Sequence, residues 1–254
     1  MNELVLNVKY YSQRDSIFKK QRGRMCYSST NAMLLEYLMP GTLAGSGQPD
    51  DRYLVKVLEF GDTVMAWAQI AALKSFGLNA EFSQSVTFSQ IDDQLDRGIP
   101  VPIGILIWGP AENPSGGGHW ILVIGRTSAG DYIVNDPYGE LNLVAGGYEN
   151  TNGEKRVYSR ANLAKRFLDR NGRGWAILAE MPGSKLTQNQ TAKPEKQNPN
   201  VRSILPISVL VDGKTTAGLL VDSKSYVQIS ELGLMNGIEI GWDQEKRQGI
   251  IKSK

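Results

Sequence analysis

The sequence predicts an α+β fold for most of the chain, followed by a small β-rich module. Three observations lead to this expectation. Apolar residues recur at helical spacing up to residue 98, apolar or alternating segments follow from residue 101, and a polar stretch precedes the C-terminal segment. We therefore expect a first domain at residues 1–181, a flexible linker at 182–200 and a β-rich module at 201–254.

The N-terminal half is expected to be mainly helical after one short strand. Residues 3–11 alternate polar and apolar side chains, as a strand does. Apolar spacing and terminating glycine or proline residues predict helices at 27–39, at 62 or 63–76, and at 87–98. The residues from Ser28 to Asn31 offer capping groups to the first helix, and Thr87 and Gln90 form a capping-box pattern at the third.

Strands are expected next, in an antiparallel arrangement. Residues 101–108 are nearly all apolar, residues 119–126 are apolar after the first, and residues 131–136 alternate. The four residues 127–130 suit a hairpin between the last two strands. A helix at 159–168 and a strand at 174–180 complete the predicted domain.

The segment after the polar stretch predicts a small β-rich module. Its expected strands lie at 207–211, 219–221, 226–229, 238–242 and 249–251. Asp212 and Gly213 favour a turn, and a helical turn is expected at 230–235. The module contains no histidine or cysteine, so we expect it to bind a ligand or to serve as a stabilising or dimerising appendage.

Composition excludes several classes of function. A net charge of +2 and a charged content of 21% lack the basic excess of proteins that bind nucleic acids or anionic membranes, so we expect neither partner. No Sec-type signal peptide or bilayer-spanning apolar run is visible, which predicts synthesis as a soluble cytoplasmic chain. A single cysteine and a single histidine exclude an internal disulfide and the usual zinc sites, so we expect chemistry without a metal or cofactor.

Cys26 lies where a polar loop meets the first predicted helix. Unpaired N–H groups and the helix dipole stabilise a thiolate at such a position, which favours a nucleophile. A buried structural cysteine is the ordinary alternative. His119 strengthens the catalytic interpretation, because three glycines precede it and leave room for a substrate above a strand-end imidazole. A histidine with a merely structural hydrogen bond is the alternative there.

A catalytic imidazole needs a partner that fixes its second nitrogen. If the hairpin pairs Arg126 with Asp131, Asp136 falls opposite Ile121 and on the face of His119. Asn135 would then point to the other face, and a slip of one residue in register would exchange the two. Asp136 could also simply cap a turn, because the residues after it favour one.

These residues carry a resemblance to a known family. Tyr11-Ser-Gln13, Met25-Cys26-Tyr27, Gly118-His119-Trp120 and Asn135-Asp136-Pro137 resemble motifs of papain-like peptidases related to the bacteriocin-processing, double-glycine leader peptidases, over roughly residues 5–180. The resemblance implies a papain-like fold and a Cys26–His119–Asp136 triad, with the Asp-Pro motif favouring Asp136 over Asn135. It also implies that Gln13 helps to hold the oxyanion; Gln21, nearer to the cysteine, is the alternative.

A second resemblance concerns the C-terminal module. Residues 213–243 resemble the small domains named for the N-terminal region of copper amine oxidases, through segments such as Gly218 to Asp222 and Ile240 to Asp243. Copper binding is not implied. A peptidase joined by a linker to such a module has the layout of a phage lysin, with the module binding a cell-wall ligand.

The sequence therefore predicts a cysteine hydrolase of amide bonds, most simply an endolysin that acts at the cell wall on the peptides of peptidoglycan. Gly117, Gly118, Trp120 and Tyr138 are expected to contact the peptide, unless the aromatic rings belong to the core. A protease of a protein or leader peptide is the second hypothesis. A catalytically silent papain-like binding protein is the alternative from another class.

Overall fold

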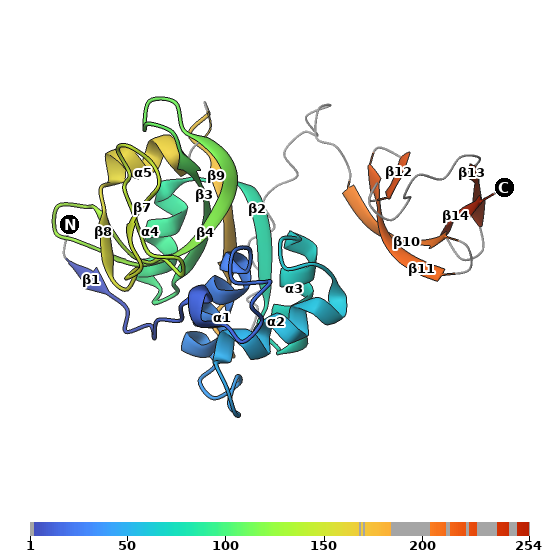
Figure 1. Cartoon of the computed structure of the whole chain (residues 1–254), viewed down its shortest axis with the longest axis horizontal. Helices are drawn as coiled ribbons and strands as arrows, with labels where there is room; N and C mark the ends of the chain where they lie inside the picture. Colours follow the sequence, from blue (N-terminus) through green and yellow to red (C-terminus); the bar gives the residue numbers. More distant parts are fainter. Residues whose placement is uncertain are drawn as a thin grey trace. The chain divides into compact units, whose positions relative to one another are not determined.

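The computed structural model describes residues 3–167, 169 and 171–183, together with the backbone of five strands between residues 204 and 253 (Figure 1). The chain divides into two compact units, Met1–Lys185 and Leu186–Lys254. Most of the linker predicted at 182–200 lies outside the described residues, so its flexibility stays a prediction.

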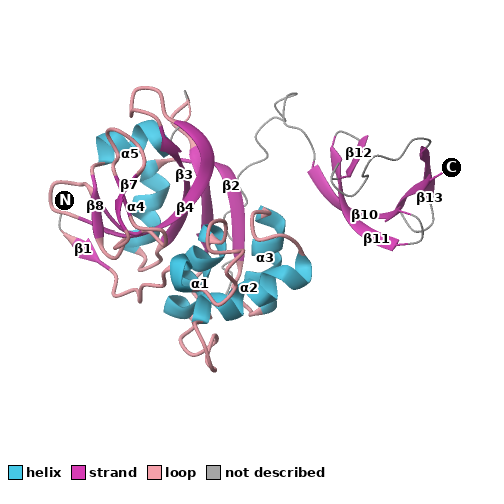
Figure 2. Cartoon of the chain, in the orientation of Figure 1, coloured by secondary structure: helices cyan, strands magenta, loops and turns pink. Residues whose placement is uncertain are grey.

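An antiparallel sheet of seven strands organises the first unit (Figure 2). The strand order is β2-β9-β3-β4-β5-β8, with β1 pairing to β4. The strands of this sheet are β1 (Leu4–Val5), β2 (Ala80–Val86), β3 (Val101–Trp108), β4 (Ser115–Arg126), β5 (Tyr132–Asn135), β8 (Arg156–Tyr158) and β9 (Gly174–Ala179). A separate pair, β6 (Glu140–Leu141) and β7 (Tyr148–Asn150), lies between β5 and β8 in the chain.

Five α-helices accompany the sheet in the described part of the first unit. They are α1 (Cys26–Leu38), α2 (Pro49–Phe60), α3 (Ala66–Ser75), α4 (Phe88–Asp96) and α5 (Arg160–Phe167). Helices α1, α2 and α3 lie together, and α1 contacts β3 and β4, whereas α4 and α5 contact β3 at another place (Figure 1). The fold is therefore α+β, as expected. Among the described residues, no helix has the length and apolarity needed to cross a bilayer.

Most expected elements are present with shifted ends. The capping box of Thr87 and Gln90 forms as predicted, and the strand expected at 119–126 begins earlier, at Ser115. Only two residues of the strand expected at 3–11 join the sheet, because the chain then leaves it and runs towards Asp136 and Pro137.

The sequence analysis missed helix α2, strand β2 and the three short strands β6, β7 and β8. Helix α2 carries a recognisable signal, since Pro49 occupies its first turn with Asp50 and Asp51 beside it. Strand β2 alternates apolar and polar side chains weakly and gains its place by pairing with β9. The place of β2 in the sheet therefore depends on pairing and burial more than on its local pattern.

The capping role expected for Ser28 to Asn31 is wrong. Met25 is the N-cap of α1 and makes no side-chain capping bond. The four polar residues lie inside the helix and are buried. Ser28 contacts Thr63, Ser29 donates to Asp50, and Asn31 donates to Gln69, so these side chains fasten α1 to its neighbours.

Asp50 is the most unusual member of this buried network. Its carboxylate is fully buried, and Ser29 Oγ donates to one oxygen at 2.7 Å. Its other oxygen has no hydrogen-bond partner within the described part of the chain. Burial raises the pKa of Asp50 from its ordinary value of 3.8 to about 7, although the bond from Ser29 opposes the shift.

We expect this carboxyl group to make the fold less stable as the pH rises. The native state holds the proton of Asp50 more tightly than the unfolded chain does. The protonated carboxyl group therefore contributes its full stabilisation below pH 3.8, and this stabilisation is lost as the pH rises to about 7. Asp50→Asn removes this titration. The free energy of unfolding of the variant minus that of wild type should therefore rise by on the order of 3 kcal/mol between pH 4 and pH 8.

Urea unfolding at several pH values measures this difference. Asp93→Asn, on the exposed side of α4, is the matched control and should follow wild type. A parallel pH dependence of Asp50→Asn and wild type would contradict the prediction.

The second unit contains a five-stranded sheet in the order β12-β11-β10-β14-β13. Its strands are β10 (Ile204–Val211), β11 (Lys214–Val221), β12 (Lys224–Val227), β13 (Ile238–Asp243) and β14 (Gln248–Ser253). Strands β10 and β14 pair in parallel, and the other neighbours are antiparallel. The Asp212–Gly213 turn and the helical turn expected at 230–235 lie outside the described residues.

Candidate active site

Cys26 is the first residue of α1 and lines a cavity of about 830 Å³. Backbone N–H groups in the first turn of a helix have no acceptor within that helix, and the helix dipole places partial positive charge there. This is the setting that the sequence predicted for a thiolate. The side chain is partly exposed, so a substrate can reach the sulfur.

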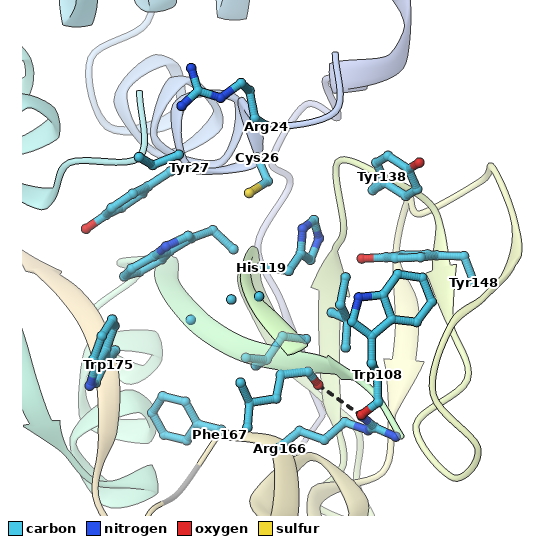
Figure 3. Close-up of a pocket in the computed structure, with 18 of the residues that line it drawn as sticks. Arg24, Cys26, Tyr27, Trp108, His119, Tyr138, Tyr148, Arg166, Phe167 and Trp175 are labelled. Carbon is cyan, nitrogen blue, oxygen red and sulfur yellow. Dashed lines mark hydrogen bonds between the residues drawn. The ribbon is translucent and has the colours of Figure 1, made fainter. Parts of the chain in front are cut away.

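His119 extends from β4 towards the sulfur of Cys26 (Figure 3). The imidazole is 4% exposed and also lines the cavity. Burial lowers the pKa of His119, but the negative charge of Asp136 and the interaction with Cys26 outweigh burial and raise the pKa to about 10. The imidazole is therefore held as an imidazolium at neutral pH, which suits an ion pair with a thiolate.

Asp136 accepts a hydrogen bond from His119 Nε2 at 2.7 Å. The register expected at the turn is wrong, because Arg126 pairs with Tyr132 rather than with Asp131. An irregularity between Val123 and Gly125 then restores the expected register, so Leu122 pairs with Asn135. Asp136 follows directly and falls on the face of His119, as predicted.

Asn135 points elsewhere. Its side chain donates to the carbonyl of Val8 at 3.4 Å and accepts from the N–H of Lys155 at 2.9 Å. The structure therefore brings Asp136, and not Asn135, to the histidine.

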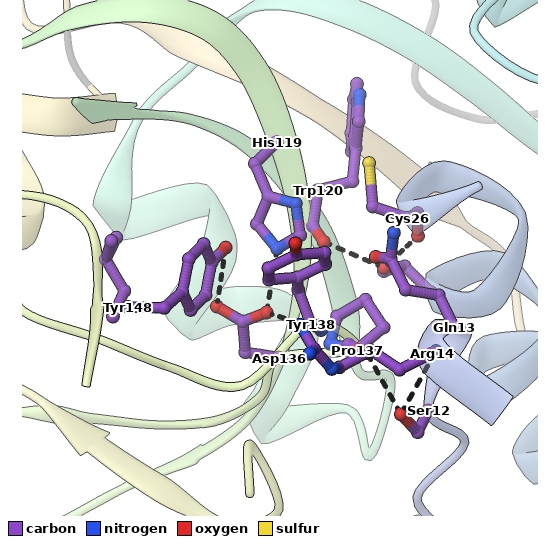
Figure 4. Close-up of polar contacts among 12 residues, drawn as sticks. Ser12, Gln13, Arg14, Cys26, His119, Trp120, Asp136, Pro137, Tyr138 and Tyr148 are labelled. Atoms are coloured by element: carbon purple, nitrogen blue, oxygen red, sulfur yellow. Dashed lines mark hydrogen bonds and ion pairs between the residues drawn. The ribbon is translucent and has the colours of Figure 1, made fainter. Parts of the chain in front are cut away.

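Both oxygens of Asp136 are occupied (Figure 4). Oδ1 accepts from His119 and from the N–H of Tyr138 at 3.0 Å, so the residue both caps a turn and orients the histidine. Oδ2 accepts from Tyr158 Oη at 3.1 Å and, at the longer distance of 3.5 Å, from Tyr148 Oη. Tyr158 Oη itself accepts from the N–H of Leu141, so its proton must point to the carboxylate.

Gln13 lies beside the start of α1, close to Cys26 (Figure 4). Its Nε2 donates to the carbonyl of Arg22 at 2.7 Å, and its backbone N–H donates to the carbonyl of Pro137 at 2.9 Å. The side chain is buried and lines the cavity. Gln21 does not line it. Geometry therefore favours Gln13 as the oxyanion donor, because one N–H of Nε2 remains besides the one bound to Arg22.

The cavity brings together the other residues expected to contact substrate. Gly117, Gly118, Trp120 and Tyr138 all line it. Sequence reasoning missed Trp175 and Phe167, which line the cavity from β9 and the end of α5, and it missed Tyr148 and Tyr158 beside Asp136. No local pattern indicated their roles, since each comes from a segment remote from Cys26.

The fold and the site together define a papain-like cysteine peptidase, a hydrolase with a helix-borne thiol facing a strand-borne imidazole. The chain belongs to the Peptidase_C39 like family, whose sequence profile matches residues 5–165. This bears out the relation to papain-like, double-glycine leader peptidases. No protein in the search of curated sequences matches the chain.

Two solved structures are similar to part of this chain. One chain, described as a C39-like peptidase from Bacillus anthracis, is 12% identical, with a TM-score of 0.47, over 71% of this chain and all of that one. The other is a double glycine motif protease from an AMS/PCAT transporter, solved in complex with the leader peptide. It is 14% identical, with a TM-score of 0.42, over 70% of this chain and 97% of that one.

Proposed function

We propose that this peptidase cleaves extended peptide segments with Cys26 as nucleophile, His119 as general acid and base, and Asp136 as the residue that orients the histidine. The observation that carries the proposal is the Asp136–His119 hydrogen bond of 2.7 Å at a cavity into which Cys26 also opens. Asp136, His119 and Cys26 follow one another as orienting group, base and nucleophile, which is the arrangement that nucleophilic acyl transfer requires.

The first half of the reaction forms an acyl-enzyme. The thiolate of Cys26 adds to the scissile carbonyl, and the C=O electron pair moves onto oxygen. The N–H of Cys26 and the Gln13 amide stabilise this oxyanion. When the carbonyl re-forms, the C–N bond breaks and His119 gives its proton to the departing amine.

The second half releases the acyl group. A water molecule takes the place of the amine, and the neutral imidazole of His119 removes its proton as it adds to the thioester. Collapse of this intermediate breaks the C–S bond and restores the thiolate, while His119 is again an imidazolium. Asp136 accepts the hydrogen bond from Nε2 throughout and so keeps the imidazole oriented.

Cleavage of a mixture of unstructured peptides tests this proposal. New amino termini, detected by mass spectrometry, should appear with the untreated protein and vanish after iodoacetamide has alkylated Cys26, which is the only cysteine in the chain. EDTA should leave the yield unchanged. Equal cleavage before and after alkylation would overturn the assignment of the nucleophile.

Peptidoglycan remains a second candidate substrate because of the two-unit layout. The ligand of the second unit depends on side chains outside the described residues, so the endolysin hypothesis stays a prediction, as does action at the cell wall. Purified peptidoglycan and permeabilised cells provide the test. Loss of turbidity with new amines and without new reducing ends supports it, whereas cleavage of free peptides alone assigns a protein or leader peptide as substrate.

A further inference from the structure

The side-chain amide of Gln13 is oriented by one hydrogen bond. Its Nε2 donates to the carbonyl of Arg22 at 2.7 Å. Its Oε1 is buried and has no hydrogen-bond partner within the described part of the chain. The backbone N–H of Gln13 donates to the carbonyl of Pro137, which places the residue but not its side chain. The direction of the second N–H of Nε2, which the oxyanion needs, therefore depends on the position of the Arg22 carbonyl.

The loop that contains Arg22 has one buried anchor. Of residues 14–24, all of which the structure describes, only Ser16 is buried. The carbonyl of Ser16 accepts from Nε of Arg22 at 2.7 Å, which ties the start of the loop to the residue that holds Gln13. The position of Ser16 therefore decides where the Arg22 carbonyl lies.

Asp51, in the first turn of α2, holds this anchor. One carboxylate oxygen accepts from Ser16 Oγ, and the other accepts from the N–H of Ile17 at 3.1 Å. These donors belong to adjacent residues, so the carboxylate holds the loop at two points. Helix α2 packs against α1. Asp51 therefore fixes the loop relative to the helix that carries Cys26.

The burial of Asp51 is costly for a purely structural contact. The residue is 3% exposed, and no cation of the described part of the chain forms an ion pair with it. A carboxylate buried without a cation is stable only if hydrogen bonds replace those of water. Here the loop supplies these hydrogen bonds, so the burial of the charge and the position of the loop depend on each other.

We propose that Asp51 is a positioning residue that holds the amide of Gln13 in place for the oxyanion. It acts through Ser16 and Arg22. This inference rests on the proposed function for the role of Gln13. Loss of an oxyanion donor lowers the rate by about a hundredfold to a thousandfold, so loss of the group that positions the donor should cost about tenfold or more.

Two reactions of the same thiol test this role. With p-nitrophenyl acetate the thiolate of Cys26 adds to the carbonyl, and the oxyanion then expels p-nitrophenolate, which needs no proton. With iodoacetamide the thiolate displaces iodide, and no oxyanion forms. The ratio of the acylation rate to the alkylation rate therefore reports oxyanion stabilisation, because changes in the reactivity of the thiolate affect both reactions. The Cys26→Ala protein gives the background for each reagent.

We expect Asp51→Ala to lower this ratio about tenfold or more. The matched control is Asp50→Asn, which alters the neighbouring buried carboxylate, keeps an oxygen for Ser29 of α1 and should leave the ratio unchanged. In the Gln13→Ala background, Asp51→Ala should lower the ratio little further, because its effect passes through the lost amide.

Arg22→Ala is the second variant, in case Asp51→Ala does not fold. Arg22 is only partly exposed, and its side chain links Ser16 to the carbonyl that holds Gln13. The ratio should again fall. An unchanged ratio in Asp51→Ala or Arg22→Ala, even with a lower melting temperature, would overturn the inference. Losses from Asp51→Ala and Gln13→Ala that multiply would do the same.

Peptide cleavage by the wild type, measured separately, distinguishes this inference from the proposed function. A ratio that depends on both Gln13 and Asp51, without any peptide cleavage, supports the positioning role and defeats the proposed function. Peptide cleavage together with a ratio that does not depend on Asp51 supports the proposed function and defeats the positioning role.

Discussion

Cys26→Ala is expected to lower kcat/KM for peptide cleavage by about five orders of magnitude or more, to near background, because no other described group can take the place of the thiolate. Cys26 is partly exposed and lines the cavity at the edge of the hydrophobic core. The folded protein should therefore keep its melting temperature to within a few degrees. Measurement of kcat/KM and thermal unfolding on the same preparation checks both statements.

Combining Cys26→Ala with His119→Ala tests whether the two residues act together in catalysis. A nucleophile and its base act together, so the loss from Cys26→Ala should nearly equal the loss from Cys26→Ala combined with His119→Ala. Cys26→Ser keeps the shape of the side chain but replaces the thiol by a far weaker acid, and we expect it to be almost as inactive. Multiplicative losses from the two alanine substitutions would show that the residues act independently and would refute the proposed mechanism.

Asp136→Ala is expected to lower kcat/KM by about three to four orders of magnitude, as seen when the orienting group of a triad is lost. The substitution leaves His119 Nε2 and the hydroxyl of Tyr158 without their buried acceptor, so the melting temperature should also fall. Asp136→Asn keeps an acceptor at the Oδ1 position, between the donors of His119 and Tyr138, but it places an N–H group against the hydroxyl of Tyr158. We therefore expect a large loss of kcat/KM for this variant as well.

The pH profile of Asp136→Asn separates charge from orientation. In the wild type, Asp136 helps to raise the pKa of His119 to about 10, so kcat/KM should stay high until the imidazolium loses its proton near that pH. Removing the negative charge lowers the pKa of His119. The alkaline limb of the profile should therefore move to lower pH in Asp136→Asn.

Asn135→Ala is the matched control for this shift. Asn135 contacts backbone atoms of residues 8 and 155 rather than His119, so its loss should reduce stability without moving the alkaline limb. An alkaline limb that stays in place in Asp136→Asn, or that moves equally in Asn135→Ala, would show that Asp136 does not set the protonation of the histidine.

Elements with strong local signals were accessible from the sequence. The helix that begins at Cys26, the capping box at Thr87 and the apolar strand at 101–108 each follow from periodicity or capping within a few residues. The candidate nucleophile and base could also be predicted from the sequence. The chain has one cysteine, at a predicted helix start, and one histidine, after three glycines, so few other residues could take these roles.

The choice of Asp136 shows how far such reasoning extends. The predicted pairing at the hairpin turn was wrong by one residue, and the irregularity near Gly125 cancelled the error before the strand reached Asn135. Strands that pair without an irregularity keep one register along their whole length. Only the folded sheet therefore decides which residue faces His119.

The sequence by itself determined the class of fold and the candidates for nucleophile and general base, because these depend on residue type and local pattern. Tertiary structure alone decided that Tyr158 reaches Asp136, that Tyr10 binds the backbone of a residue 126 positions away, and that Trp175 lines the cavity. These contacts arise when the sheet pairs distant segments and the helices pack onto it. Their geometry depends on the whole packed core and not on the neighbours of each residue in the chain.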